Sequence, residues 1–490
     1  MSPRAAVYLA LPSLAILCAG IPGTEIPAST ATAAAGQAAR REDAPKEVND
    51  QIRREQFDLV LPEVMRKNHV DMWIHVMREG VTDPFGAEDL GSTSGVFVFT
   101  DRGANRIERA ALERRWGASF APETWPVDWD TSSVEESKAY DIVAAPILVK
   151  QPAGAPMKTE YDYRFKGLRA FVEERDPRRI AVNFKSDLGP YPTSTRSQDG
   201  LSHTDYVLLC KELGEKYASR LVSSEYLMMD YIIRKVPTEI QLLKTLRKDE
   251  EDQVSKAFAS IVPGVTKNRE VGLDVFRRRG NGISQRGRTP GQENVVIRGG
   301  DIVASPSQGM YAYVLRKGEI EPPADIKRVW SDYRKIDRIL MESIKAGLTP
   351  REIVRNYTVR FEKEGFIVKD EQLQLSTPRE DFRAFSAGLP AGRTIVNVDC
   401  HGMGKGARKR KFENYFGPRI GSNGPEWTWD VPLPPIHHLV LEYFFYVPWP
   451  STEYDDQYLF FWDHEQALAT EHGVEYLSPT KKELYLIKQQ

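Results

Sequence analysis

Two apolar segments near the C-terminal end of this chain decide its fold: His437–Tyr443, HHLVLEY, and Tyr458–Glu465, YLFFWDHE, joined through a turn that contains Pro and Asp. Their aromatic and β-branched residues predict two neighbouring strands. Each segment also carries carboxylate or imidazole side chains. Burying a carboxylate among apolar neighbours is costly unless a cation or hydrogen bonds compensate it. The two strands therefore predict a site that shares a cation.

The composition of the chain is that of a globular protein. Its 490 residues are 41% hydrophobic and 28% charged, with a formal net charge of -2. This length allows two or three domains, and the balanced charge implies neither nucleic acid nor an anionic membrane as a partner. Cys210 and Cys400, the two cysteines beyond the N-terminal segment, lie far apart. We therefore expect a packed core rather than a disulfide framework to stabilise the fold.

The N-terminal segment has the pattern of an export signal. A basic start, Met1–Arg4, precedes an apolar run, Ala5–Gly20, and a tract of small residues, Pro27–Ala39. We interpret residues 1–36 as a signal peptide, which predicts a secreted or periplasmic protein. The apolar run is short and contains Pro12, so no stable membrane anchor is expected. An uncleaved anchor is the alternative.

The rest of the chain has two parts with different patterns. Residues 37–236 alternate helical stretches with short apolar strands such as Val70–Val76 and Gly95–Phe99, which predicts an α/β domain. Residues 237–490 combine long charged helices with apolar strands, which predicts an α+β domain whose antiparallel sheet is covered by helices. We place the domain boundary between residues 236 and 237.

Several helix starts in the second part are marked by their residues. Thr238 is a plausible N-cap for a charged helix that extends to Ser260, and Asp325–Ala346 has the pattern of a second helix. Thr349-Pro350-Arg351-Glu352 is a capping box with Pro at the first helical position. It predicts a third helix.

The order of these elements and of several short motifs resembles a known family. The motifs are Pro237–Ile240, Gly300–Val303, Tyr313–Glu319, Gly347–Pro350, His401–Gly404, Leu441–Glu442 and Glu471–Leu477. In this order they resemble the pita-bread (M24) metallopeptidases, which include aminopeptidase P, prolidase and creatinase. Phe57–Trp73 and Val96–Phe99 resemble the N-terminal domain of the same group. The resemblance implies a creatinase-like α/β domain followed by a pita-bread α+β domain.

The resemblance also implies a metal chemistry from which this sequence departs. In the family, two Asp, one His and two Glu hold two metal ions that activate water. Ile302–Ala312, where both Asp ligands are expected, has no carboxylate. Two ions close together need several anionic ligands to offset their repulsion. We therefore expect that the dinuclear centre has been lost and that no cofactor is bound, or a single manganese, zinc or cobalt ion.

The resemblance assigns roles to three residues. His401 lies in the Gly-rich loop of the family's His ligand, Glu442 takes the place of one Glu ligand, and His464 stands at the position of the second Glu. His401 and Glu442 are the candidate catalytic residues, and Glu442 and His464 are the candidate metal ligands. Lys405, in the basic stretch after His401, is a candidate partner for Glu442, and a structural ion pair of Glu442 with an arginine is the alternative.

Two classes of function are compatible with these residues. The first is an Xaa-Pro aminopeptidase-like hydrolase of a peptide or small molecule, either with a reduced metal site or without metal, as in creatinase, where a His is the general base. The second is a non-catalytic binding module for an acidic partner. Its candidate surface comprises the basic residues Arg277–Arg279, Arg286, Arg288 and Lys405–Lys411. The resemblance further implies a homodimer.

Overall fold

The computed structural model describes most of the chain that follows the N-terminal segment. The described residues are 44–78, 83, 85–112, 132–144, 165, 167–186, 200–276, 294–369, 392–403, 417–421, 426–448, 458–478 and 483–489. The predicted signal peptide, residues 1–36, lies outside them. The basic surface predicted for a binding module, Arg277–Arg279, Arg286, Arg288 and Lys405–Lys411, also lies outside the described residues.

The first sheet is a mixed sheet buried on both faces. Its strands have the order β4-β3-β2-β1-β5-β6. Their bounds are β1 Met72–Met77, β2 Gly95–Asp101, β3 Ile107–Leu112, β4 Ile142–Ala144, β5 Ile180–Val182 and β6 Leu221–Ser223. β1 is antiparallel to β2 and parallel to β5. Successive residues of β1 point to opposite faces, so Trp73 and Ile74 pack in two different apolar clusters.

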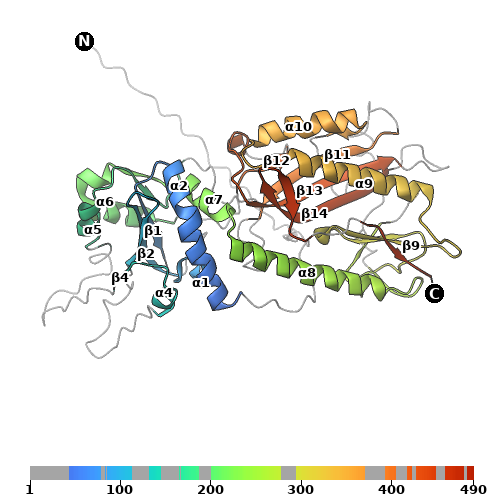
Figure 1. Ribbon diagram of the computed structural model, residues 1–490, viewed down its shortest axis with the longest axis horizontal. Helices are drawn as coiled ribbons and strands as arrows, with labels where there is room; N and C mark the ends of the chain where they lie inside the picture. The colour runs from blue at the N-terminus through green and yellow to red at the C-terminus, as the bar shows by residue number, and fades with distance from the viewer. Residues whose placement is uncertain are drawn as a thin grey trace, which may run out of the picture. The chain divides into compact units, whose positions relative to one another are not determined.

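Helices supply the other side of both clusters. Their bounds are α1 Lys46–Glu55, α2 Leu61–Lys67, α5 Leu168–Arg175, α6 His203–Ala218 and α7 Glu225–Ile233. Ile52 and Leu227, on α1 and α7, belong to the cluster that contains Trp73. Val172 and Leu209, on α5 and α6, belong to the cluster that contains Ile74. A sheet with helices on both faces confirms the predicted α/β class for this part of the chain (Figure 1).

The second sheet contains the two strands that the sequence predicted side by side. Its strands have the order β10-β11-β13-β14-β15, and β12 pairs with β11. The bounds are β10 Ile367–Val368, β11 Ile395–Gly402, β12 Ile420–Gly421, β13 His437–Pro448, β14 Tyr458–Thr470 and β15 Gly473–Tyr476. β13 and β14 form an antiparallel ladder along the full length of β13. This ladder fixes which polar side chains share a face.

A third, smaller sheet contains Ile302–Ala312, the segment in which the resemblance led us to expect two Asp ligands. Its order is β16-β9-β8-β7, with β7 Asp274–Phe276, β8 Ile302–Ser305, β9 Met310–Val314 and β16 Tyr485–Ile487. A single 3-10 turn, Pro306–Gln308, joins β8 to β9. Ala304 and Tyr311 on this hairpin are buried. The short hairpin therefore carries apolar and hydroxyl side chains and no carboxylate.

Three long helices accompany these sheets: α8 Pro237–Ala259, α9 Ala324–Ser343 and α10 Pro350–Lys363. The capping box predicted for α10 is confirmed, since the Thr349 hydroxyl accepts from the Glu352 N–H and Glu352 accepts from the Thr349 N–H. The prediction that Thr238 caps α8 is wrong. Pro237 has no N–H and fills the first helical position, so Thr238 lies inside the first turn, and its hydroxyl donates to Glu55.

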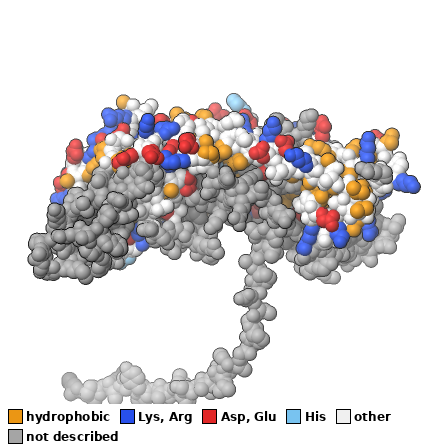
Figure 2. Space-filling view, turned by 90° about the horizontal axis from the view of Figure 1, so that it is seen from below, with side chains coloured by type: hydrophobic (Ala, Val, Ile, Leu, Met, Phe, Trp, Pro, Cys, Tyr) orange, Lys and Arg blue, Asp and Glu red, His pale blue; other side chains and the backbone are white. Residues whose placement is uncertain are grey.

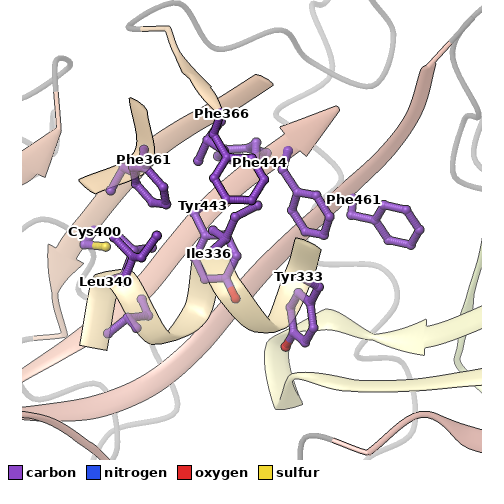
Figure 3. Close-up of a cluster of buried hydrophobic side chains, with 14 of the residues drawn as sticks. Tyr333, Ile336, Leu340, Phe361, Phe366, Cys400, Tyr443, Phe444 and Phe461 are labelled. Atoms are coloured by element: carbon purple, nitrogen blue, oxygen red, sulfur yellow. The ribbon is translucent and has the colours of Figure 1, made fainter. Parts of the chain in front are cut away.

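The largest core cluster lies between α9, α10 and one face of the second sheet (Figure 1). Ile336 and Leu340 of α9, one helical turn apart, and Phe361 of α10 pack against Cys400 and Tyr443 of the sheet (Figure 3). Fully burying one such aliphatic or aromatic side chain contributes about 1.5–3 kcal/mol. This packing fixes the sheet from one side, and the opposite face carries the candidate site.

The described surface carries charges of both signs. Lys, Arg, Asp and Glu side chains are interspersed on the face seen in Figure 2, as the net charge of -2 leads one to expect. Among the described helices, no helix is both long enough and apolar enough to cross a membrane.

The predicted boundary at residues 236 and 237 falls where α7 has ended and α8 begins, and it stays a prediction.

Candidate metal centre

Three strands bring the three predicted residues to one face of the second sheet. His401 lies on β11, Glu442 on β13 and His464 on β14. Glu442 and His464 are directly opposite in the β13–β14 ladder, so their side chains share a face. His401 is opposite Val440, two residues from Glu442. Residues two apart on a strand face the same way, so all three side chains point to the same side.

The side chains of His401, Glu442 and His464 converge closely. One nitrogen from each His and one carboxylate oxygen all lie within 4.8 Å of one another. His401 Nε2 is 3.3 Å from Glu442 Oε2, and the two His rings have centroids 5.6 Å apart. The His401 side chain is 1% exposed and that of Glu442 14% exposed. Among the described residues this is the one group of three or more His, Cys, Asp or Glu side chains that could hold a metal ion.

The orientation of His401 creates an electrostatic requirement. Its Nδ1 lies 3.2 Å from the Gly402 carbonyl oxygen, which only accepts, so this contact is a hydrogen bond in the tautomer that carries its proton on Nδ1. In the neutral ring Nε2 then presents a lone pair to Glu442. Two acceptors at 3.3 Å repel each other unless a proton or a cation lies between them. The His401–Glu442 contact is therefore built for a proton or a metal ion.

An aromatic pair lies beside this group on the same face. Phe444 and Trp462 are directly opposite in the ladder, one pair further along from Glu442 and His464. Their rings are stacked, with an interplanar angle of 11° and centroids 6.4 Å apart. The Trp462 ring centroid also lies 5.9 Å from that of His464. Phe444 is buried and Trp462 is half-buried, so the indole presents an apolar surface next to the three ligand-type side chains.

Asp463, which interrupts the same apolar run in the sequence, points to the opposite face. It is fully buried and accepts from the Tyr333 hydroxyl at 2.8 Å and from the Tyr443 hydroxyl at 3.0 Å. Asp337 of α9 accepts from the hydroxyls of Tyr443 and Tyr476. Burial raises the pKa of Tyr333 and Tyr443, and the neighbouring Asp charges raise it further, so both remain hydroxyl donors. The Asp463 carboxylate is therefore compensated by hydrogen bonds from two tyrosine hydroxyls.

Glu465 also points away from the candidate centre and is compensated by an ion pair. Its fully buried carboxylate lies 3.2 Å from Nη2 of Arg247, which is on α8. Arg247 also pairs with Glu250 and Glu251 and donates to the Ser307 carbonyl. On this face the carboxylates of β14 are therefore compensated by tyrosine hydroxyls and a guanidinium, and not by a cation shared between the two strands.

His437 and His438 are both buried, each being 1% exposed. Burial is the main cause that lowers the pKa of His437 to about 4; the Lys235 charge acts in the same direction, and the Ile233 carbonyl opposes the shift. Burial likewise lowers the pKa of His438, whose Nε2 lies 3.2 Å from the Gln466 amide oxygen. Neither His joins the group formed by the three candidate ligands.

One predicted residue cannot be placed, and one pair of charged residues was not predicted. Lys405, the predicted partner of Glu442, lies outside the described residues. A carboxylate and an arginine that sequence reasoning missed lie near the group: Arg419 forms a bidentate pair with Asp399 of β11. Asp399 is two residues before His401, so strand alternation alone could have placed it on the same face. Its partner Arg419 directly precedes the separate short strand β12, which no motif in the sequence marks.

Comparison with solved structures returns peptidases. An Xaa-Pro dipeptidase from Bacillus anthracis matches at 16% identity and TM-score 0.44, covering 89% of this chain and 100% of that chain. An X-Pro aminopeptidase from Thermotoga maritima MSB8 matches at 12% identity and TM-score 0.46, covering 87% and 100%. The chain resembles Xaa-Pro peptidases in its fold. No family model matches the sequence, and no curated protein matches it either.

A third peptidase adds to the same group. Proline aminopeptidase P II from Yersinia pestis matches at 12% identity and TM-score 0.43, covering 88% of this chain and 96% of that chain. These are the enzymes that the sequence motifs resemble. Identities and TM-scores this low describe a similarity of fold, and the chemistry of this chain must be argued from its own side chains.

Proposed function

We propose that this chain is a hydrolase of peptide or related amide bonds that works with one divalent cation held by His401, Glu442 and His464. The observation that carries the proposal is the convergence of two imidazoles and one carboxylate, all within 4.8 Å, on one sheet face. Three neighbouring strands of one sheet hold these groups. Rigid elements of this kind maintain a ligand geometry better than loops do.

The three donors suit a catalytic transition-metal ion. Imidazole and carboxylate ligands together bind zinc, manganese or cobalt, and three protein ligands leave a coordination position open. The lone pairs of His401 Nε2 and Glu442 Oε2, 3.3 Å apart, supply a specific fit, because a cation between them removes their repulsion. When bound, the ion would supply Lewis-acid activation of a carbonyl group and of water.

The chain's own residues would orient the substrate and handle the proton. The Gly402 carbonyl fixes the His401 ring by accepting from Nδ1, which keeps Nε2 directed at Glu442. The Glu442 side chain is 14% exposed, and its carboxylate would accept a proton from an incoming water. Trp462 provides an apolar surface against which a substrate side chain can pack.

A second candidate function is hydrolysis without metal. The same 3.3 Å contact favours it, because a protonated His401 and an ionised Glu442 satisfy each other without any ion. In that case His401 exchanges the proton and Glu442 orients it. The two candidates differ in one readout: chelation abolishes turnover of the metal enzyme and leaves the metal-free enzyme unchanged.

The test measures metal content and turnover on the same sample. Chain purified without residues 1–36 is analysed by elemental mass spectrometry, and hydrolysis of Xaa-Pro dipeptides is assayed with manganese and with chelator. We expect about one ion per chain and chelator-sensitive turnover. Glu442→Gln and His464→Ala should each lower metal affinity by on the order of 100-fold or more, because each removes a ligand.

Matched controls change the same residue types at exposed positions. Glu475→Gln and His472→Ala alter side chains on the surface of the β14–β15 hairpin. Both should keep the metal content and turnover of the unmodified chain. Turnover that survives chelation but is lost in Glu442→Gln would transfer the proposal to the metal-free mechanism. A folded chain with neither metal nor turnover would contradict both, and would leave the predicted binding module.

Export remains part of the proposed role of this protein. The basic start and apolar run within residues 1–36 support a signal peptide, and with it a secreted or periplasmic hydrolase. N-terminal sequencing of the protein from the medium or the periplasm tests this directly. A mature N-terminus near residue 37 is expected, and an intact Met1 in the cell body would contradict it.

A further inference from the structure

A second carboxylate lies next to Glu442 on the face of the candidate centre. The β11–β13 register is the same on both sides of Asp399, since Val398 is opposite Tyr443 and His401 is opposite Val440. That register places Asp399 level with Glu442. Opposite residues in antiparallel strands have Cβ atoms about 4.5–5.5 Å apart and share a face. Two carboxylates therefore lie on neighbouring strands on the same face of the sheet.

Asp399 is held by an arginine. Arg419 Nε lies 2.6 Å from Asp399 Oδ1, and Arg419 Nη2 lies 2.5 Å from Asp399 Oδ2. The Asp399 side chain is 4% exposed and that of Arg419 is 15% exposed. A bidentate pair of this kind is among the strongest hydrogen-bonded contacts of a carboxylate. It turns the Asp399 carboxylate toward the guanidinium, and Asp399 is not one of the three residues that converge as candidate ligands.

A short strand, β12, directly follows Arg419 in the chain. β12 consists of Ile420 and Gly421, and it pairs with Asp399 and Cys400 of β11. Gly421 has φ of 131°, and a Cβ there would lie 2.2 Å from the Val398 carbonyl oxygen. Only glycine permits so close an approach of the two backbones. The local chain is thus shaped to bring the residue before Ile420, which is Arg419, onto Asp399.

The charges at the centre balance through this pair. Asp399 and Glu442 bring two carboxylates to this face of the sheet, and the Arg419 guanidinium forms a bidentate contact with the first of them. Two metal ions about 3.5–4 Å apart are the usual way to offset several carboxylates at a hydrolytic site. A guanidinium offsets one carboxylate permanently, because it does not lose its proton and cannot coordinate a metal.

We propose that Arg419 takes the place of a second metal ion beside Glu442, and so restricts the centre to one ion. The inference rests on the proposed function, in which His401, Glu442 and His464 hold that one ion. Asp399 is a metal ligand withheld by its arginine. The absence of carboxylates from Ile302–Ala312 and the presence of Arg419 then have the same effect, which is to remove both the ligands and the need for a second ion.

The test counts manganese ions in the whole chain without residues 1–36. Arg419→Met removes the charge and keeps the length of the side chain. Arg419→Met combined with Asp399→Asn removes the released carboxylate as well. Arg351→Met is the matched control, because it removes a bidentate pair with Asp430 at 2.9 and 3.1 Å on the exposed surface. Equilibrium dialysis against manganese with elemental analysis gives the ions per chain, and electron paramagnetic resonance reveals spin coupling between adjacent manganese ions.

The proposal predicts one more ion in Arg419→Met than in the unmodified chain, with a spin-coupled signal. The double variant and Arg351→Met should return to the unmodified count. Equal counts in the unmodified chain and Arg419→Met overturn the inference, as does a second ion that persists in the double variant. The count in the unmodified chain tests the proposed function separately. No ion there, with one Asp399-dependent ion in Arg419→Met, would reject the proposed function and keep only the part of the inference in which Arg419 takes the place of a metal ion beside Glu442.

A second variant keeps the inference testable if Arg419→Met does not fold, which circular dichroism and thermal unfolding would reveal. Asp399→Asn leaves the guanidinium without its carboxylate beside Glu442. The uncompensated charge should then weaken binding of the single ion about tenfold, by repulsion and by competition for Glu442. An unchanged manganese affinity in folded Asp399→Asn would show that Arg419 does not act as a cation at this centre.

Discussion

The two faces of the second sheet treat buried carboxylates in opposite ways. On the face covered by α9, Asp463 accepts from the hydroxyls of Tyr333 and Tyr443, which are neutral donors that stay protonated. On the other face, Glu442 lies against His401, whose nearer nitrogen carries a lone pair in the neutral ring. The first arrangement is complete as it stands. The second requires a proton or a cation.

The comparison shows what marks a site in this sheet. A buried carboxylate is present on both faces, so its presence does not separate structure from function. The distinguishing feature is the chemistry of its partners. Tyrosine hydroxyls and the Arg247 guanidinium are hydrogen-bond donors that keep their protons as long as the protein is folded. Imidazoles exchange protons and bind metals. The predictions below separate these two kinds of partner, beginning with the largest expected effect.

Breaking the buried ion pair on the structural face should cost the most stability. Glu465→Ala leaves Arg247, whose side chain is 1% exposed, without its buried partner. Removing one member of a buried pair costs about 3–5 kcal/mol, and the Glu250 and Glu251 contacts should keep the loss near the lower end. Urea unfolding measures it. Manganese affinity of the folded variant should be unchanged, and a large loss of affinity would mean that the faces are not independent.

The His residues of β13 give a pH dependence that belongs to the fold. Burial holds the pKa of His437 at about 4 in the folded chain, below its ordinary value of 6.5. Between pH 4 and 6.5 the unfolded chain binds more protons at His437 than the folded chain does. The contribution of His437 to the free energy of unfolding is therefore fully present above about pH 6.5 and is lost as the pH falls toward 4. The loss from this group is on the order of 3 kcal/mol.

His437→Gln tests this pH dependence. The variant should flatten the curve of unfolding free energy against pH between about 6.5 and 4, measured by urea unfolding at a series of pH values. His472→Ala, at an exposed position, should leave the curve unchanged. An unaltered slope in His437→Gln would mean that another group, such as His438, accounts for the acid sensitivity.

Removing one hydroxyl donor from Asp463 should have a moderate and purely structural effect. Tyr333→Phe deletes the 2.8 Å hydrogen bond but leaves the donation from Tyr443. Loss of one donor to a buried charged group costs about 1–3 kcal/mol. Thermal and urea unfolding measure the cost, with exposed Tyr485→Phe as the control. Metal content should not change, and a change would indicate that the network also positions His464.

The features of this molecule that the sequence predicted are those encoded by short, local sequence patterns. Long runs of aromatic and β-branched residues predicted β13 and β14, and the box at Thr349 predicted α10. The positions of His401, Glu442 and His464 followed from family motifs, and the structure brings them together. Asp463 and His464 are adjacent in sequence, yet alternation along a strand sends them to opposite faces. That alternation places His464 on the face of Glu442 and Asp463 on the face covered by α9.

The remaining features depend on contacts that no local pattern contains. Arg247 meets Glu465 from a helix more than two hundred positions earlier, and Arg419 meets Asp399 through a strand of only two residues. Thr238 failed as a cap because a single proline shifted the helix start by one residue. Partner identity, which decides between structure and site, is therefore set by tertiary packing. Single-sequence reasoning identifies the polar residues but not what satisfies them.

The smallest expected effect concerns the aromatic pair beside the centre, and it tests whether that face orients a substrate. Trp462→Ala removes the half-buried indole that stacks on Phe444 and lies next to His464. If a substrate side chain packs there, kcat/KM for dipeptides with a ring beside the scissile bond should fall about tenfold, equivalent to about 1.4 kcal/mol. Peptides with glycine at that position should lose little.

The control for this change is Trp429→Ala, which removes a tryptophan of similar exposure that packs on Arg351 instead. It should leave the ratio of the two kcat/KM values unchanged. An equal loss for ring-bearing and glycine peptides in Trp462→Ala would show that the indole supports the ladder without selecting substrates. A selective loss with unchanged metal content would place the substrate over the face that carries His401, Glu442 and His464. The chemistry and the recognition would then share one side of the sheet, while tyrosines and an arginine stabilise the other.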